Sequence, residues 1–213
     1  MGEASCLPHS IFSLLYMNEN IFWQKANITL LDREELNKHK GAVIWLSGLS
    51  SSGKSTIALV LEEKLFSMGC KSFILDGDNI RHGLCKDLSF SLKDRTENIR
   101  RISEVSKLFY QAGMITIVSF ISPQAEDRLA AKALIEPGRF FEIYCKCPLS
   151  VCEERDVKGL YKQARLGNIK NFTGISSPYE EPENPELIIN TDLEPSDQSM
   201  EKVIQLLKEK SII

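Results

Sequence analysis

Residues 48–55, Gly-Leu-Ser-Ser-Ser-Gly-Lys-Ser, combine types and spacing that point directly to chemistry. They complete the pattern G-x-x-x-x-G-K-[ST] of a phosphate-binding loop. In such a loop, backbone N–H groups face the anion, Lys54 reaches the β- and γ-phosphates, and the Ser55 hydroxyl can ligate Mg²⁺. The alternative is an ordinary Gly/Ser turn that happens to contain a lysine.

The flanking sequence favours the phosphate-binding interpretation. Residues 42–46 are a short apolar run typical of a buried strand, and residues 56–68 place apolar side chains at helical spacing. Gly69 then ends the predicted helix. A strand, a glycine-bounded loop and a helix N-terminus are the setting that phosphate binding requires, because the positive end of the helix dipole faces the anion.

A second predicted strand, residues 72–75, is followed directly by Asp76, Gly77, Asp78 and Asn79. Residues that follow a parallel strand lie at the carboxyl edge of the sheet, where α/β proteins bind ligands. Asp76 could hold a Mg²⁺-bound water, or act as a base that orients an acceptor hydroxyl. Its alternative role is that of a turn-forming residue before Gly77.

Three basic residues, Arg81, Arg95 and Lys158, lie on segments predicted to reach the same edge. A lone arginine is usually solvated, but three converging basic residues favour an anionic acceptor. Phe90 and Phe172 lie in polar loops, where they could stack on a purine or, alternatively, fasten a lid to the core.

The rest of the chain alternates between predicted helices and strands. This predicts an α/β, three-layer fold with a five-stranded parallel sheet, helices on both faces and a lid at residues 156–185. The further predicted helices are residues 32–36, 94–112, 124–136, 149–155 and 196–210, and the further strands are residues 115–120, 140–145 and 187–189.

Composition limits the remaining possibilities. The chain has 213 residues, a net charge of −3 and a pI near 5.7, so a general nucleic-acid surface is not expected. No apolar run is long enough for a membrane span. The six cysteines are expected to be reduced cytoplasmic thiols, with Cys145 and Cys147 buried on one face of a strand. Residues 1–19 fit no targeting class, so we expect a disordered or mis-started extension with translation from Met17, followed by one domain at residues 20–213.

Taken together, several blocks of the chain closely resemble the adenylyl-sulfate kinase family, over about residues 20–210. The blocks, in family order, are residues 48–56, 76–84 (Asp-Gly-Asp-Asn-Ile-Arg-His-Gly-Leu), 95–101 (Arg-Thr-Glu-Asn-Ile-Arg-Arg), 119–123 (Ser-Phe-Ile-Ser-Pro), 158–161 (Lys-Gly-Leu-Tyr) and 172–175 (Phe-Thr-Gly-Ile).

The resemblance implies transfer of the ATP γ-phosphate to the ribose 3′-hydroxyl of adenylyl sulfate, giving 3′-phosphoadenylyl sulfate and ADP in sulfate assimilation. It also implies dependence on Mg²⁺, a fold of the nucleotide-kinase type, a cytoplasmic homodimer, and an association with ATP sulfurylase as a further expectation.

The resemblance also implies roles for individual residues. Lys54, Asp76 and Ser122 would be catalytic, with Ser55 and Asp76 at the metal. ATP would be bound by Gly48, Ser51, Ser52, Gly53, Lys54, Ser55, Thr56 and the lid arginine Arg165. Adenylyl sulfate would be bound by Asp76, Gly77, Asp78, Asn79, Arg81, Phe90, Arg95, Asn98, Ile121, Ser122, Lys158, Asn171 and Phe172.

Ser122 matches a serine described in the family as a phosphoserine intermediate. In-line transfer to a bound hydroxyl needs no covalent intermediate, so we expect Ser122 to hydrogen-bond the acceptor instead.

Several residues depart from the family pattern: Ser51 stands where glycine or alanine is common, Cys85 where asparagine is usual, and Ser89 and Asn171 where glycine precedes a phenylalanine. Gln124 and Ala125 also replace the usual aromatic–basic pair. None removes a group that the chemistry needs, so we expect effects on loop conformation and substrate affinity. Two other functions stay open from the sequence: a P-loop kinase for a sugar, shikimate or nucleoside, and a catalytically silent nucleotide-binding subunit.

Overall fold

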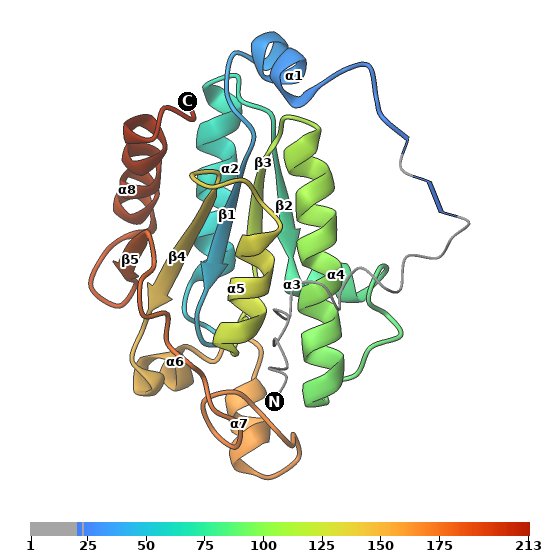
Figure 1. Cartoon of the computed structure of the whole chain (residues 1–213). Coiled ribbons are helices and arrows are strands. Elements are labelled where there is room, and N and C mark those ends of the chain that lie inside the picture. Colours follow the sequence, from blue (N-terminus) through green and yellow to red (C-terminus); the bar gives the residue numbers. More distant parts are fainter. Residues whose placement is uncertain (1–20, 23) are drawn as a thin grey trace, which may run out of the picture.

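Strands and helices alternate along the chain in the computed structural model, which describes residues 21–22 and 24–213 (Figure 1). The strands form one parallel sheet in the order β2–β3–β1–β4–β5, which confirms the predicted five-stranded parallel sheet. The strands are β1 (Ala42–Ser47), β2 (Ser72–Asp76), β3 (Ile115–Ser119), β4 (Phe140–Lys146) and β5 (Leu187–Asn190).

Helices cover both faces of this sheet, so the predicted three-layer fold is confirmed (Figure 1). The helices are α1 (Leu30–Asn37), α2 (Lys54–Ser67), α3 (Gly77–Arg81), α4 (Leu92–Gln111), α5 (Ala125–Ala133), α6 (Leu149–Arg155), α7 (Leu160–Arg165) and α8 (Ser196–Glu209). Apolar side chains of α2 and α8 pack on one face, and those of α4 and α5 pack on the other. Every residue of the central strand β1 is buried as a result.

The carboxyl ends of three neighbouring strands meet at one edge of the sheet. Residue pairing places Leu46 of β1 beside Ser119 of β3, and Ser119 beside Asp76 of β2. The loop of residues 48–53 leaves β1 at this edge, and α6 and α7 lie beyond it (Figure 1). The sheet therefore brings the phosphate-binding loop, Asp76 and the segment after β3 together.

Two segments differ from the sequence-based expectation. The polar residues after β2 form the helix α3, for which no helix was predicted. The Asp76 carboxylate caps this helix by accepting a hydrogen bond from the backbone N–H of Asp78. Five residues are too few to show helical periodicity in a sequence. The predicted lid at residues 156–185 contains the short helix α7 rather than loop alone.

Some predictions from composition can also be compared with the structure. Five cysteines, Cys70, Cys85, Cys145, Cys147 and Cys152, are free and buried, which confirms the predicted burial of Cys145 and Cys147. Cys6 and the predicted extension at residues 1–19, with its start at Met17, lie outside the described residues. Within the described part of the chain, no helix is both long and apolar enough to cross a membrane.

Candidate active site

The phosphate-binding loop connects β1 to α2 and depends on glycine at both of its ends. At Gly48, with φ of 144°, an added Cβ would come within 2.6 Å of the Cys145 carbonyl oxygen. Gly53 is the N-cap of α2 in the left-handed conformation, with φ of 88°. Both conformations exclude most side chains. The loop is therefore fixed by the backbone, with the N-terminus of α2 directly behind it.

Lys54 is the first residue of α2 and lies under the loop. Its side chain is buried, and its ammonium donates a hydrogen bond of 2.6 Å to the Leu49 carbonyl oxygen. Burial lowers the pKa of Lys54 to about 8. Among the described residues, no carboxylate lies within ion-pairing distance of this ammonium. A buried cation that lacks a counter-ion is suited to binding a phosphate.

Ser55 and Asp76, the two residues expected at the metal from the resemblance, come together from different elements. The Ser55 hydroxyl donates a hydrogen bond of 2.8 Å to Asp76 Oδ2 and lies 3.3 Å from the Ser119 hydroxyl. Mg²⁺ prefers oxygen ligands and usually takes only one or two from the protein, with waters and substrate phosphates filling its shell. The donor set therefore fits Mg²⁺, although no group of three or more His, Cys, Asp or Glu in the described residues could form a complete metal cage.

The other predicted ATP-binding residues differ in their surroundings. Ser52 is fully buried inside the loop, whereas Thr56 is exposed on the first turn of α2. Ser51 has a left-handed backbone with φ of 58°, a conformation in which a glycine would be unstrained. Arg165 of α7 lies on an exposed surface and pairs with Glu153 at 2.5 Å, so its predicted role at the phosphates stays a prediction.

On the acceptor side, two arginines surround Phe90. The Arg81 guanidinium carbon lies 4.3 Å from the centre of the Phe90 ring, and Arg95 Nε donates a hydrogen bond of 3.0 Å to the Phe90 carbonyl. Phe90 is 62% exposed. Burial lowers the pKa of both arginines, and Arg81 lowers that of Arg95 further by charge repulsion. Two adjacent cations and an exposed aromatic face form a site suited to an anionic aromatic ligand.

Polar residues of three further segments complete this side. Lys158, which precedes α7, forms an ion pair with Asp78 of α3, and Asn79 is exposed on the same short helix. Asn98 of α4 is buried, and its Oδ1 has no hydrogen-bond partner within the described residues. An unpaired buried acceptor is rare in folded proteins, so Asn98 has bonding capacity for a ligand. Gly77 packs against Phe120, where an added Cβ would make only ordinary contact at 3.4 Å.

The segment after β3 holds Ser122 in an unexpected orientation. Its hydroxyl is buried and accepts a hydrogen bond of 3.0 Å from Trp45 Nε1, and its backbone is left-handed with φ of 46°. Arg128 donates a hydrogen bond of 2.7 Å to the Ser122 carbonyl and so holds the turn. Ile121, beside it, is only partly buried. Contact between the Ser122 hydroxyl and the acceptor stays a prediction. Because the hydroxyl is the acceptor in its hydrogen bond with Trp45, its own proton can still be donated to a ligand.

The lid is fastened to both sides of the site. Tyr161 of α7 donates a hydrogen bond of 3.0 Å to the Ser50 carbonyl, and Phe172 packs edge-on against Tyr161 at 5.0 Å. Arg95 donates to the Asn171 carbonyl at 2.5 Å and to the Thr173 hydroxyl at 2.7 Å. Phe172 is therefore buried in the lid cluster in this structure, which corresponds to the alternative role considered from the sequence.

The departure from the family pattern at Asn171 has a structural reason. The Asn171 backbone is left-handed, with φ of 56°, at a position where the family pattern has glycine. Asparagine is one of the few other residues that adopt this conformation readily. The substitution therefore preserves the turn that leads into Phe172.

Sequence reasoning missed Arg155, at the end of α6. It donates a hydrogen bond of 2.7 Å to the Thr191 carbonyl after β5, and it lies 3.5 Å from the Ser51 carbonyl and 3.6 Å from Cys147 Sγ. Its guanidinium thus joins the phosphate-binding loop to the segment after β5, at the donor side of the site. The only signal in the sequence was its position just before the lid.

The fold and the site together define a P-loop kinase. A sugar kinase from Janibacter sp., which is 18% identical to this chain, shares the fold with a TM-score of 0.55 over 78% of this chain and 94% of its own.

More specific comparisons give the family. A family model described as adenylylsulphate kinase matches residues 40–190, and the chain belongs to this family. The adenylyl-sulfate kinases of Acaryochloris marina and Oceanobacillus iheyensis are 52% and 55% identical to it, covering 94% and 91% of this chain and 98% of each relative. The Mycobacterium tuberculosis APS kinase CysC, solved in complex with AMPPNP and APS, has a TM-score of 0.76 at 46% identity, covering 80% of this chain and 99% of that one.

Proposed function

We infer that the protein transfers the γ-phosphate of ATP to the ribose 3′-hydroxyl of adenylyl sulfate, giving 3′-phosphoadenylyl sulfate and ADP. The observation that carries this inference is the pairing of two unlike sites at one sheet edge. A buried, uncompensated Lys54 lies on one side, and Arg81, Arg95 and the Phe90 ring lie on the other. A P-loop kinase of this family needs both.

The donor side binds and orients ATP. Backbone N–H groups of residues 48–53 and the N-terminus of α2 face the phosphates, and Lys54 neutralises their charge. Arg155 and Thr191 close the other side of this site. Ser55 and Asp76 would hold Mg²⁺, which when bound neutralises charge on the β- and γ-phosphates.

The acceptor side places the attacking hydroxyl. Arg81, Arg95 and Lys158 bind the anionic sulfate–phosphate group, and Phe90 stacks on the adenine. The O3′ lone pair forms a bond to the γ-phosphorus as the bond from that phosphorus to the β–γ bridging oxygen breaks. Asp76, next to Ser55, accepts the proton that leaves O3′.

Transfer is direct, without a phosphoserine. Among the described residues, Ser122 has no histidine or carboxylate as a hydrogen-bond partner: its hydroxyl accepts from Trp45 and its carbonyl from Arg128. A nucleophilic serine needs an adjacent base. With chiral γ-thiophosphate, we expect inversion at phosphorus and retained turnover in Ser122→Ala. Net retention of configuration would establish a phospho-enzyme and contradict direct transfer.

The working form that we propose is a cytoplasmic homodimer that depends on Mg²⁺, with an association with ATP sulfurylase as a further expectation. Family resemblance supports each of these points. Light scattering of the purified protein at micromolar concentration measures the oligomeric state directly, and a monomeric mass with full activity would exclude the dimer as the working form.

The deciding experiment is turnover of the purified protein with ATP, Mg²⁺ and adenylyl sulfate, followed by identification of the nucleotide products. We expect ADP and 3′-phosphoadenylyl sulfate in equal amounts. Gluconate, shikimate and a nucleoside serve as competing acceptors, and a clear preference for any of them would contradict this proposal. Normal ATP binding without ADP release would instead indicate a silent nucleotide-binding subunit.

A further inference from the structure

The loop of residues 82–91 joins α3 to α4 and carries Phe90 at its end. It contains turns but no helix or strand of its own. Arg81, at the end of α3, donates from Nη1 to the carbonyls of Leu88 and Ser89, both at 3.2 Å, and covers the Phe90 ring. The conformation of this loop therefore decides where both the ring and the Arg81 guanidinium lie.

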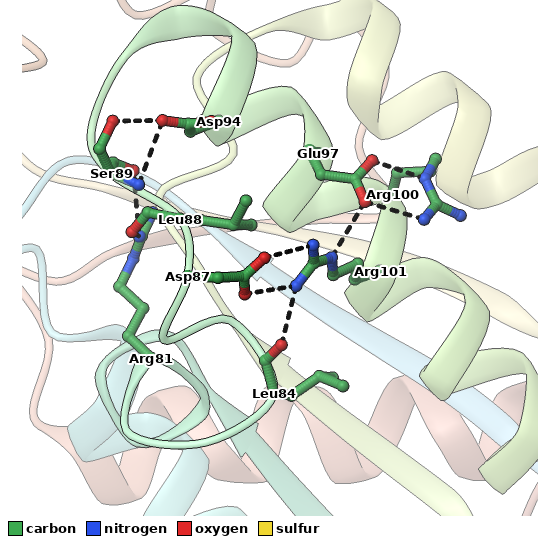
Figure 2. A network of polar contacts seen from close by, with 9 residues as sticks. All are labelled: Arg81, Leu84, Asp87, Leu88, Ser89, Asp94, Glu97, Arg100 and Arg101. Atoms are coloured by element: carbon green, nitrogen blue, oxygen red, sulfur yellow. Dashed lines mark hydrogen bonds and ion pairs between the residues drawn. The ribbon is translucent and has the colours of Figure 1, made fainter.

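Arg101, on α4, holds the first part of this loop at Leu84 and Asp87. Its Nη1 and Nη2 donate to the two carboxylate oxygens of Asp87, both at 2.7 Å, and Nη1 also donates to the Leu84 carbonyl at 2.9 Å. Its Nε donates to Glu97 on the same helix at 2.9 Å. Four of the five N–H donors of the guanidinium are thus used, and Figure 2 shows the side chain between the loop and Glu97.

The last part of the loop, next to Phe90, is held by a separate contact between Ser89 and Asp94. The Asp94 carboxylate accepts hydrogen bonds from the backbone N–H of Ser89, at 3.1 Å, and from the Ser89 hydroxyl (Figure 2). Ser89 is one of the departures from the family pattern, and here its hydroxyl is what reaches Asp94. The loop is therefore held at Leu84 and Asp87 by Arg101, and close to Phe90 by Asp94 and Arg81. Only the hold at Leu84 and Asp87 depends on Arg101.

We propose that Arg101 is a positioning residue for the acceptor site, which acts by fixing the loop of residues 82–91 through Asp87 and Leu84. The proposal rests on the proposed function, because Phe90 and Arg81 are taken to bind adenylyl sulfate. Without the contacts to Asp87 and Leu84, the first part of the loop samples more conformations, and only the fraction with Phe90 and Arg81 in place binds the acceptor. The apparent affinity falls in proportion to that fraction.

Arg100 provides a matched control on the same helix. It also makes a bidentate contact with Glu97, at 2.7 and 2.9 Å, but it makes no hydrogen bond to the loop and points away from it in Figure 2. Replacing either arginine by alanine removes one positive charge and one partner of Glu97. Only Arg101→Ala also removes the contacts with Asp87 and Leu84 of the loop.

The first measurement is steady-state kinetics of the two variants with both substrates. We expect Arg101→Ala to raise the KM for adenylyl sulfate about tenfold and to leave the KM for ATP and the value of kcat within about twofold. Asp87→Asn, which keeps the shape of the partner, should raise the same KM severalfold. Arg100→Ala should match the wild type in all three parameters.

A second measurement separates positioning from general destabilisation. We expect hydrogen exchange of the backbone amides at residues 84–90 to speed up in Arg101→Ala but not in Arg100→Ala, with saturating adenylyl sulfate restoring protection. Equal kinetic effects of the two variants, or a rise in both KM values in Arg101→Ala, would overturn the proposal. If the wild type itself does not turn over adenylyl sulfate, the proposed function fails, whereas the exchange comparison without ligand still tests whether Arg101 holds the loop.

Discussion

The donor and acceptor sides of the site are built in different ways. The donor side is a run of eight neighbouring residues, 48–55, fixed by backbone conformation and with Lys54 buried beneath it. The acceptor side gathers single residues from α3, α4, the loop of residues 82–91 and the lid, and its Phe90 is 62% exposed. A locally encoded site is formed before its ligand arrives, whereas an assembled site depends on contacts between distant segments. Substitutions on the two sides should therefore affect different kinetic constants.

Asp76→Asn is expected to have the largest effect, because Asp76 lies where the two sides meet. The change is nearly isosteric, so the fold and ATP binding should survive while the carboxylate charge next to Ser55 is lost. Turnover should fall by about 10²–10⁴-fold, the range for loss of a positioned general base. Wild-type rates would show that Asp78 or water accepts the proton instead. Single-turnover kinetics and isothermal titration of ATP make the two measurements.

Arg95→Ala should affect the acceptor side alone. Arg95 is tied to the carbonyls of Phe90 and Asn171 and to the Thr173 hydroxyl, so its loss removes a cation and loosens the lid together. A charge-assisted contact contributes about 1.5–3 kcal/mol, which corresponds to a rise of about ten- to hundredfold in the KM for adenylyl sulfate. The KM for ATP should stay nearly unchanged. A rise in the ATP value instead would place this arginine on the donor side.

The pH dependence of ATP binding should report on the donor side. Burial lowers the pKa of Lys54 from 10.5 to about 8 in the ligand-free protein, so above pH 8 the neutral form predominates. The Kd for ATP should therefore rise about tenfold between pH 7 and pH 9, while the Kd for adenylyl sulfate should not follow it. Lys54→Arg, which keeps its charge, should remove this dependence. A flat profile in the wild type would show that the free lysine is already neutral, or that it stays charged.

The lowered pKa of Lys54 should also change how the stability of the protein depends on pH. Between pH 8 and 10.5 the unfolded chain binds a proton at Lys54 that the folded ligand-free protein does not. The contribution of Lys54 to the free energy of unfolding should therefore rise with pH in this window. Urea unfolding of the wild type and of Lys54→Met at pH 8 and pH 10 measures this difference.

Arg155→Ala should give the smallest kinetic effect, and it should affect the KM for ATP where Arg95→Ala affects the KM for adenylyl sulfate. Arg155 joins the Thr191 carbonyl to the donor side without entering the loop of residues 48–53. We expect a rise of about three- to tenfold in the KM for ATP and little change for adenylyl sulfate. Equal changes in both constants would mean that the two sides are coupled through α6 and the lid.

Much of the fold could be predicted from the sequence because its signals are local. Apolar periodicity gave the elements of the sheet and of its covering helices to within a few residues. The prediction failed at α3, where one polar side chain, Asp76, caps a helix too short to show a pattern. The sequence also did not indicate a role for Arg155, since a lysine or arginine near a lid is usually solvated.

The sequence by itself determined the donor site. The residue types and spacing of residues 48–55 suffice to predict it, because a glycine-bounded loop between a strand and a helix is a local pattern of the chain. The acceptor site could be listed residue by residue through resemblance, but only the tertiary structure decided how those residues meet. Arg95 reaches Asn171 and Thr173 across more than seventy positions of the chain, and Ser122 turns its hydroxyl toward Trp45, a residue on another strand. Such contacts depend on where loops of no regular pattern come to rest on the folded core, and no local spacing encodes that.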